Sequence, residues 1–109
     1  MDEVFQEIAS LDRLIHEPAR LAIMTALMAC QSADFLYLQR LTGLTGGNLS
    51  VHLSRLEEVG LIEIEKRFID NRPNTFVKLT DEGRESIAAY WKKLETLHKS
   101  AEKFKSENA

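Results

Sequence analysis

Apolar residues recur with helical spacing in the first third of the chain. The 4-3-4 spacing of one apolar helix face is present at Val4, Ile8, Leu11 and Ile15. This pattern predicts an N-terminal helix over about residues 3–16, and Pro18 suits the first turn of the next helix. We expect that next helix to lie at the centre of the domain, because its apolar face is broad and contains Leu21, Ile23, Met24, Leu27 and Met28.

Two short helices joined by a tight turn are predicted next. Residues 31–34 are predicted to form a loop, in which Asp34 is placed to cap a helix that carries Phe35, Leu38 and Leu41. Residues 42–45 form the turn, and Thr45 is a good N-cap for a helix over 46–58. That helix presents Leu49, Leu53 and Leu56 on one face and stops at Gly60, a residue common just past helix ends.

After Gly60 the periodicity changes from helix to strand. Residues 61–66 alternate apolar and charged side chains, which predicts a strand with one solvated face. Residues 75–79 are predicted to be its partner, with turn residues at 70–74 between them. Thr80 then caps a final helix over about 81–105, which carries a heptad seam of Ile87, Tyr90, Leu94, Leu97, Ala101 and Phe104.

This order of elements predicts a mainly α fold with a small β-hairpin, namely a winged helix-turn-helix with dimerisation helices at both ends. The length of 109 residues fits a single domain over 1–109. Within it, residues 17–80 would form the winged-helix core. We expect one domain to be unable to bury Leu97 and Phe104, so a twofold mate should cover them. The predicted dimer interface contains Val4, Phe5, Ile8, Leu11, Ile87, Tyr90, Trp91, Leu94, Leu97, Ala101 and Phe104.

Charge is unevenly distributed along the chain, although the net charge is only −3. Residues 1–34 carry six acids and two bases, whereas residues 66–78 carry four bases and one acid. The hairpin therefore has a local positive charge, which is the kind that meets phosphates. The chain opens without a leader pattern, and its only cysteine, Cys30, cannot form an internal disulfide, so we expect a cytoplasmic protein.

Three segments resemble one family of regulators. Residues 49–62 (LSVHLSRLEEVGLI) resemble the recognition helix and first wing strand of MarR-like and ArsR-like regulators. Residues 79–84 (LTDEGR) resemble the LT-x-x-G-R segment that closes the wing in the MarR-like group, and residues 11–21 resemble the opening of a compact single-domain subgroup. The resemblance implies a homodimer that binds an operator, often under the control of a ligand or a chemical signal.

The helix over 46–58 is the predicted recognition helix, whose outward face would read bases in the major groove. Asn48 can pair with adenine, Arg55 with guanine or phosphate, and Val51 with a thymine methyl group. Gly46 and Gly47 would let backbone amides approach a phosphate, although turn geometry alone also explains glycines there. The predicted DNA contacts of this segment are Thr45, Gly46, Gly47, Asn48, Val51, His52, Ser54 and Arg55.

The hairpin would be the wing. Arg72, beside Pro73, is a rigidly placed cation suited to the DNA backbone or the minor groove. The ribbon would add Lys66, Arg67, Asn71, Asn74 and Lys78, although charges on hairpins also give solubility and protect strand edges. We therefore expect a repressor that reads an inverted repeat through residues 46–58 and 66–78.

The sequence leaves two alternative functions open and indicates that several kinds of site are absent. A winged helix can instead be a protein-interaction module, which would be insensitive to salt where DNA binding is not. A small-molecule sensor with a pocket at the dimer interface is compatible with DNA binding. We expect no catalytic residues, cofactor or metal site, because His16, His52 and His98 are scattered and no paired carboxylates or phosphate loop are present. Cys30 is expected to be a small buried hydrophobe rather than a redox sensor.

Overall fold

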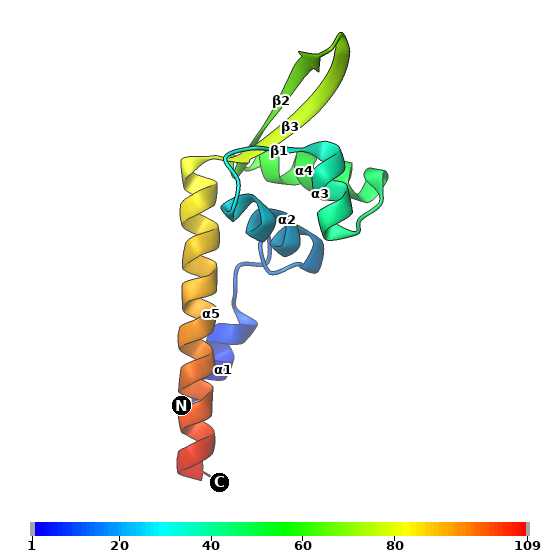
Figure 1. Cartoon of the computed structure of the whole chain (residues 1–109). Coiled ribbons are helices and arrows are strands. Elements are labelled where there is room, and N and C mark those ends of the chain that lie inside the picture. The colour runs from blue at the N-terminus through cyan, green and yellow to red at the C-terminus, as the bar shows by residue number, and fades with distance from the viewer. Residues whose placement is uncertain (1, 109) are drawn as a thin grey trace.

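The computed structural model describes residues 2–108 and divides into two parts. We call residues 18–79 the head and α5, with α1 along it, the arm; together they measure 63 × 25 × 21 Å (Figure 1). The elements, in chain order, are α1 (Asp2–Ala9), α2 (Pro18–Met28), β1 (Ala33–Asp34), α3 (Phe35–Thr42), α4 (Gly46–Glu58), β2 (Ile62–Ile69), β3 (Arg72–Leu79) and α5 (Asp81–Asn108).

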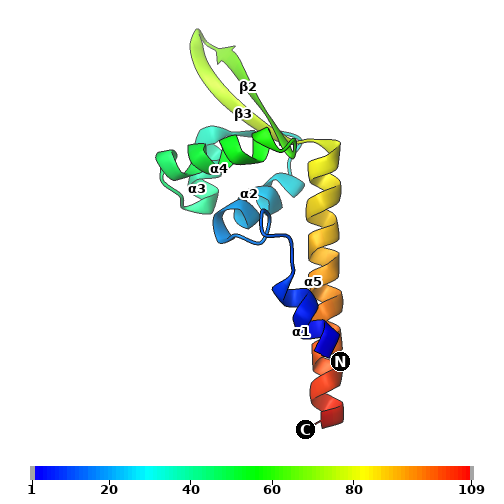
Figure 2. The same ribbon diagram turned by 180° about the vertical axis from the view of Figure 1, so that it is seen from behind.

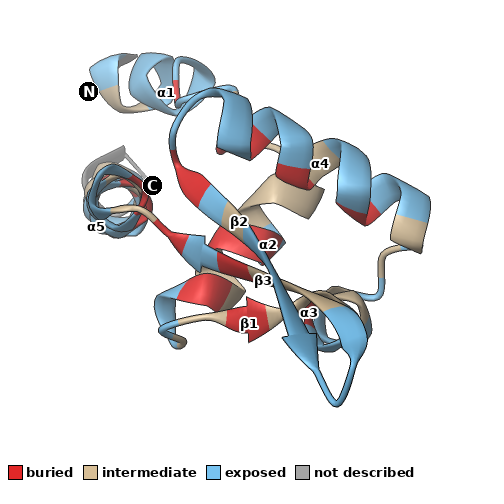
Figure 3. Cartoon of the chain, turned by 90° about the horizontal axis from the view of Figure 1, so that it is seen from above, coloured by how far each residue is buried: buried red, intermediate tan, exposed pale blue. Residues whose placement is uncertain are grey.

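The core of the head is centred on α2, as the broad apolar face of that helix predicted. Its residues Ile23, Met24 and Leu27 are completely buried, whereas Met28, also predicted for this face, is 36% exposed at the end of the helix. They form one cluster with Leu38 of α3 and with the predicted inward face of α4, shown in red where buried in Figure 3. The helical spacing of residues 35–58 therefore predicted both helices and the buried face of α4. The predicted face of α3 is wrong at Leu41, which is 55% exposed, since only Leu38 of that face is fully buried.

The helix ends are set by the capping residues that the sequence indicated. The Asp34 carboxylate accepts a hydrogen bond from the Tyr37 amide at 2.9 Å, and the Thr45 hydroxyl accepts one from the Asn48 amide at 3.2 Å. These side chains satisfy amides that have no partner within the helix. Beyond α4, Gly60 has a φ of 79°, a left-handed conformation that glycine adopts without strain.

The sheet has one strand more than predicted. Its order is β1-β3-β2, all antiparallel, and β1 pairs Ala33 with Val77 and Asp34 with Phe76. Residues 31–34 were expected to be a loop, because a strand of two residues is too short to show an alternating pattern. Only pairing with β3 makes this segment a strand.

The turn of the wing is shorter than predicted. β2 and β3 pair from Ile62 opposite Leu79 up to Ile69 opposite Arg72, which leaves a two-residue turn at Asp70 and Asn71. Both turn residues have positive φ, 53° and 63°, a conformation that Asp and Asn tolerate and that two-residue hairpins require. The predicted turn over 70–74 is therefore wrong beyond Asn71, and residues 72–74 begin β3.

The N-terminal helix also ends earlier than predicted, at Ala9 rather than near residue 16. The Asp12 carboxylate accepts a hydrogen bond from the Leu14 amide at 2.9 Å, a local turn that competes with helix formation. Leu11 and Ile15 are nevertheless buried. Their apolar character is therefore explained by burial of a non-helical segment and not by a helix. We call residues 10–17 the linker.

The arm is formed by the predicted final helix, which extends to Asn108. At its start the Thr80 hydroxyl accepts a hydrogen bond from the Gly83 amide at 3.0 Å, as expected of an N-cap. Helix α1 packs along the C-terminal half of α5 (Figures 1 and 2). It covers Leu97, which is only 4% exposed, and places the ring of Phe5 edge-on to that of Phe104 at 5.5 Å. The expectation that one chain cannot bury Leu97 is therefore wrong, because α1 supplies the cover.

Candidate nucleic-acid interface

Helix α4 presents one face to solvent over its whole length. The predicted base-reading residues Asn48, Val51 and Arg55 are exposed, and Val51 is 67% exposed. Gly47 and Ser54 are exposed beside them. The opposite face is in the core, so the helix is held rigidly while this polar face is left free. The face is suited to binding an external surface with alternating polar and apolar groups, as base edges in a groove are.

The two glycines at the start of α4 are not required by the packing of the head. A Cβ added to Gly47 would meet nothing within 4 Å, and one added to Gly46 would make only ordinary contact with Gln39 at 3.8 Å. Neither has positive φ; the positive-φ glycines of the described chain are Gly43 and Gly60. Turn geometry therefore does not account for Gly46 and Gly47. What they provide is access to the first backbone amides of α4 from outside.

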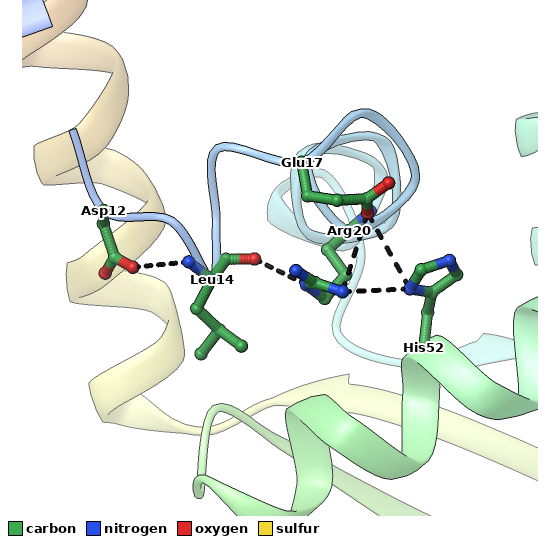
Figure 4. A network of polar contacts seen from close by, with 5 residues as sticks. All are labelled: Asp12, Leu14, Glu17, Arg20 and His52. Carbon is green, nitrogen blue, oxygen red and sulfur yellow. Dashed lines mark hydrogen bonds and ion pairs between the residues drawn. The ribbon is translucent and has the colours of Figure 1, made fainter. Parts of the chain in front are cut away.

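His52 is turned away from that face and toward α2 (Figure 4). Its Nδ1 lies 3.3 Å from Nη1 of Arg20 and 3.7 Å from Oε2 of Glu17. The Nε of Arg20 also donates to the Leu14 carbonyl at 2.6 Å. Arg20 thus connects the linker to α4, and His52 takes part in anchoring that helix. A DNA contact by His52 stays a prediction.

Glu17 completes this cluster as an anion. Partial burial raises the pKa of its carboxyl, but hydrogen bonds from the amides of Arg20 and Ala19, with the charges of His52 and Arg20, lower the pKa of Glu17 below its ordinary value. Its carboxylate also caps α2 by accepting from the Arg20 amide at 2.8 Å. Sequence reasoning missed Glu17 and Arg20, since their contact with His52 joins segments 32 or more positions apart. The one local signal in the sequence was an acidic residue directly before Pro18, a position from which it can cap the helix.

The cations of the wing fall into two groups. Arg67 forms an ion pair with Glu65 at 3.0 Å, and its guanidinium lies 4.3 Å from the ring centre of Phe76. The hydrogen bond from Arg67 lowers the pKa of Glu65. Lys78 is paired with Glu63 at 3.4 Å. The second group consists of Lys66 and Arg72. Both are exposed, and neither forms an ion pair with any residue that the structure describes.

Against the exposed carboxylate of Asp70 at the turn, these two cations leave the wing with an excess of positive charge, whereas Arg67 and Lys78 face partner carboxylates on the ribbon. The ribbon and α4 lie at the same end of the molecule, away from the free end of α5 (Figures 1 and 2). Asn71 at the turn is exposed and Asn74 is half-buried on β3. The arrangement places one exposed helix face and one cationic ribbon where a single extended anion could contact both.

A cavity of about 280 Å³ lies between the linker and α5. Its lining is mixed, and consists of Leu11, Asp12, Ile15, Ser86, Ala89, Tyr90 and Lys93. Burial raises the pKa of the Tyr90 hydroxyl, which is also in hydrogen-bond contact with His16 Nδ1.

The single cysteine, Cys30, lies outside this cavity and is partly buried. Its backbone carbonyl accepts a hydrogen bond from the Arg84 guanidinium at 3.3 Å.

Within the described part of the chain, no group of three or more His, Cys, Asp or Glu side chains is placed to hold a metal ion. Nor does that part contain a helix with the length and apolar character needed to span a membrane.

Comparison with known proteins gives consistent matches. The family model described as winged helix DNA-binding domain matches residues 19–98. An uncharacterized protein of Methanocaldococcus jannaschii is 33% identical over 90 residues, which are 83% of this chain and 98% of that protein. The solved structure of a transcriptional regulator homologue from Pyrococcus horikoshii is 33% identical, with a TM-score of 0.81 over 91% of this chain and 97% of that one.

A mutant of MarR from E. coli has the same fold at 22% identity, with a TM-score of 0.67 over 91% of this chain and 76% of that one. The predicted fold, a winged helix-turn-helix with added terminal helices, is confirmed by these structures.

Proposed function

Because the chain belongs to the winged helix DNA-binding domain family and is a DNA-binding transcriptional regulator, we propose that it is a homodimeric repressor of an inverted-repeat operator. The observation that carries the proposal is the free face of α4 beside a wing whose Lys66 and Arg72 are unpaired. In each half-site α4 enters the major groove and the wing lies over the adjacent backbone and minor groove. Occlusion of a promoter is the simplest output of such a complex.

The two elements divide reading from positioning. Asn48, Val51 and Arg55 contact base edges, and the amides at Gly46 and Gly47 approach a phosphate. Lys66 and Arg72 bind phosphates and set the register. Arg67 and Lys78 contribute less, because their charges are already paired. Thr45, Ser54, Asn71 and Asn74 supply further polar contacts, and His52 acts mainly by holding α4 against α2.

Dimerisation is assigned to the arm. Phe5, Ile8 and Trp91 leave 49%, 36% and 38% of their surface exposed along it. One head presents one recognition helix, so a two-fold mate is needed for two half-sites. Of the residues predicted for the interface, Leu11, Ile87, Tyr90 and Leu97 are already buried within the chain. The proposed contact surface is therefore formed by the exposed Phe5, Ile8 and Trp91, together with the partly exposed remainder, Val4, Leu94, Ala101 and Phe104.

Selection of bound duplexes from a random DNA pool tests the function. We expect enrichment of an inverted repeat, whose centre-to-centre spacing reports the separation of two α4 helices. The affinity for that repeat should fall steeply between low and physiological salt, because phosphate contacts release counterions. Failure to enrich any duplex, or binding that is insensitive to salt, would favour the protein-interaction alternative and overturn the proposal.

The cavity between the linker and α5 favours a second role, control by a small molecule. Its walls combine apolar Leu11 and Ile15 with the cation of Lys93 and the carboxylate of Asp12, which suits a small organic acid that also carries a hydrogen-bond donor. Release of the selected duplex by a panel of small carboxylic acids tests this role. The variant Ala89→Leu, which fills the cavity, should bind the duplex but no longer respond. Equal responses of the variant and the wild type would remove the cavity from consideration.

A further inference from the structure

The end of the wing carries apolar side chains that project into solvent. Phe68 is 78% exposed, more than any other large apolar residue in the described chain. The next residue in the sequence, Ile69, is 46% exposed. Pro73, the cross-strand partner of Phe68, is exposed as well. We call Phe68, Ile69 and Pro73 the apolar tip.

The folding of the head does not account for the apolar tip. Because side chains alternate along a strand, Phe68 is on the same face of β2 as Ile62 and Ile64, which pack in or against the core. Lys66, which lies between Ile64 and Phe68 on that face, is exposed. The apolar stripe that stabilises the head therefore ends at Ile64, and Phe68 begins a separate apolar site beyond a charged position.

The apolar tip is held in a defined geometry. The ladder between β2 and β3 continues to Ile69 opposite Arg72, directly behind the two-residue turn. Pro73 has its φ restricted by its own ring. The Phe68 side chain is thus presented from a paired strand that projects from the head (Figure 1). Such a position loses little further backbone freedom on binding, which favours a specific contact.

The surroundings of the tip define what it can bind. Lys66 lies two positions before Phe68 on the same face, and Arg72 adjoins Pro73; both cations are exposed and unpaired among the described residues. Arg72 pairs with Ile69 and is therefore on the opposite face of the ribbon from Phe68, and the exposed carboxylate of Asp70 lies in the turn. With one unpaired cation on each face of the ribbon and one acid at the turn, the tip keeps an excess of positive charge, which suits an anionic surface with an apolar interior. A DNA minor groove has this character, with phosphates along both edges and stacked bases within. The same end of the molecule carries α4, whose residues Asn48, Val51 and Arg55 are exposed.

We propose that Phe68 is a wedge that enters the minor groove beside each half-site and partly unstacks one base step, bending the duplex. The inference rests on the proposed function and adds to it a source of specificity that needs no hydrogen bond. Pyrimidine–purine steps unstack most readily, so the position under the wing should favour TA or CA/TG steps. Lys66 and Arg72 would hold the phosphates on either side of the opened step.

The test measures bending of the duplex that wild-type protein enriches from the random pool, with fluorophores at both ends. We expect the wild type to bring the ends closer, and Phe68→Ala to lose most of that change and about 10-fold in affinity. Its salt dependence should stay that of the wild type, because no charge is removed. Phe68→Leu, which keeps an apolar wedge, should retain most of the bend.

Val59→Ala is the control for loss of an exposed apolar side chain, since Val59 is 46% exposed but lies at the C-cap of α4, away from the wing tip. It should bend and bind the duplex as the wild type does. Equal unfolding curves for the three variants would show that none acts through stability. An unbent wild-type complex, or wild-type bending by Phe68→Ala, would overturn the wedge while leaving the repressor intact. Failure of the wild type to enrich any duplex would overturn both.

Discussion

The head and the arm bury their apolar residues in different ways. In the head, three helices and a sheet surround one centre, and residues such as Met24, Leu38 and Leu56 are completely buried. In the arm, α5 is covered by α1 on one side, and Phe5 and Trp91 remain substantially exposed. The head therefore surrounds a closed centre, to which Ile87 of α5 also belongs, whereas the arm is covered along only part of its surface and leaves Phe5, Ile8 and Trp91 for contact with another molecule. Stability should depend mainly on the first part and assembly on the second.

The largest effect is expected at the junction of the two parts, from Gly83→Ala. A Cβ at Gly83 would lie 1.9 Å from the carbonyl oxygen of Leu61, which itself accepts a hydrogen bond from the Thr80 amide. Helix α5 would have to move away from the sheet, so we expect unfolding to become easier by about 3 kcal/mol. Urea denaturation measures this change.

Gly47→Ala is the control for that variant, because a Cβ there meets nothing within 4 Å. It should leave stability unchanged or raise it by up to about 1 kcal/mol, owing to the better helix propensity of alanine. If Gly83→Ala were equally well tolerated, the close approach of α5 to the backbone of Leu61 would not be a determinant of the fold. Loss of operator affinity in Gly47→Ala at full stability would support backbone approach to a phosphate.

The arm is tested by Leu97→Asp. An aspartate under α1 would be a buried, unpaired charge, so α1 should detach and the apolar surface of the arm should be disrupted. We expect the wild type to sediment as a dimer at micromolar concentration and this variant as a monomer. Operator affinity should fall about 100-fold, because two linked half-site contacts become one.

Leu41→Asp places the same charge on the surface of the head, where Leu41 is already exposed. This control should remain dimeric in the same sedimentation experiment. A monomeric wild type would exclude the arm as a dimer interface, as would a Leu97→Asp variant that stays fully dimeric.

Within the head, reading and positioning can be separated by Asn48→Ala and Arg72→Ala. Removal of the Asn48 amide should lower affinity by about 1–3 kcal/mol for the preferred base and relax the choice at that position. Removal of the Arg72 charge should weaken binding to all duplexes alike and make the slope of log affinity against log salt shallower by about one unit. Titrations against a panel of single-base operator variants measure both. A change of base preference in Arg72→Ala alone would reverse the assignment.

The smallest effect is expected where the linker meets the head, from Arg20→Met. The variant keeps the length of the side chain but loses the hydrogen bonds to the Leu14 carbonyl and to His52. Each such bond contributes about 0.5–1.5 kcal/mol, and we expect a loss of stability of about 1 kcal/mol with a fall in operator affinity below 10-fold. A double-mutant cycle with His52→Ala should show non-additive losses of affinity. Strict additivity would show that Arg20 does not position α4.

The comparison of head and arm also separates what could be predicted from what could not. The bounds of α4 and the caps at Asp34, Thr45 and Gly60 follow from local spacing and local hydrogen bonds, and the structure contains them as predicted. The spacing of Leu11 and Ile15 was misread as helical, because periodic burial and helical geometry give the same pattern over a few residues. The local turn at Asp12 decided between them.

For the candidate site, the sequence determined which residue types occupy the exposed face of α4 and the wing, since both are read from a period of 3.6 or of 2. The tertiary structure decided which of them are free. It paired Arg67 and Lys78 on the ribbon, turned His52 toward Arg20, and left Lys66, Arg72 and Phe68 exposed. It also folded α1 onto α5, joining Phe5 to Phe104. Contacts between residues far apart in the chain depend on how whole elements pack, and no local pattern records them.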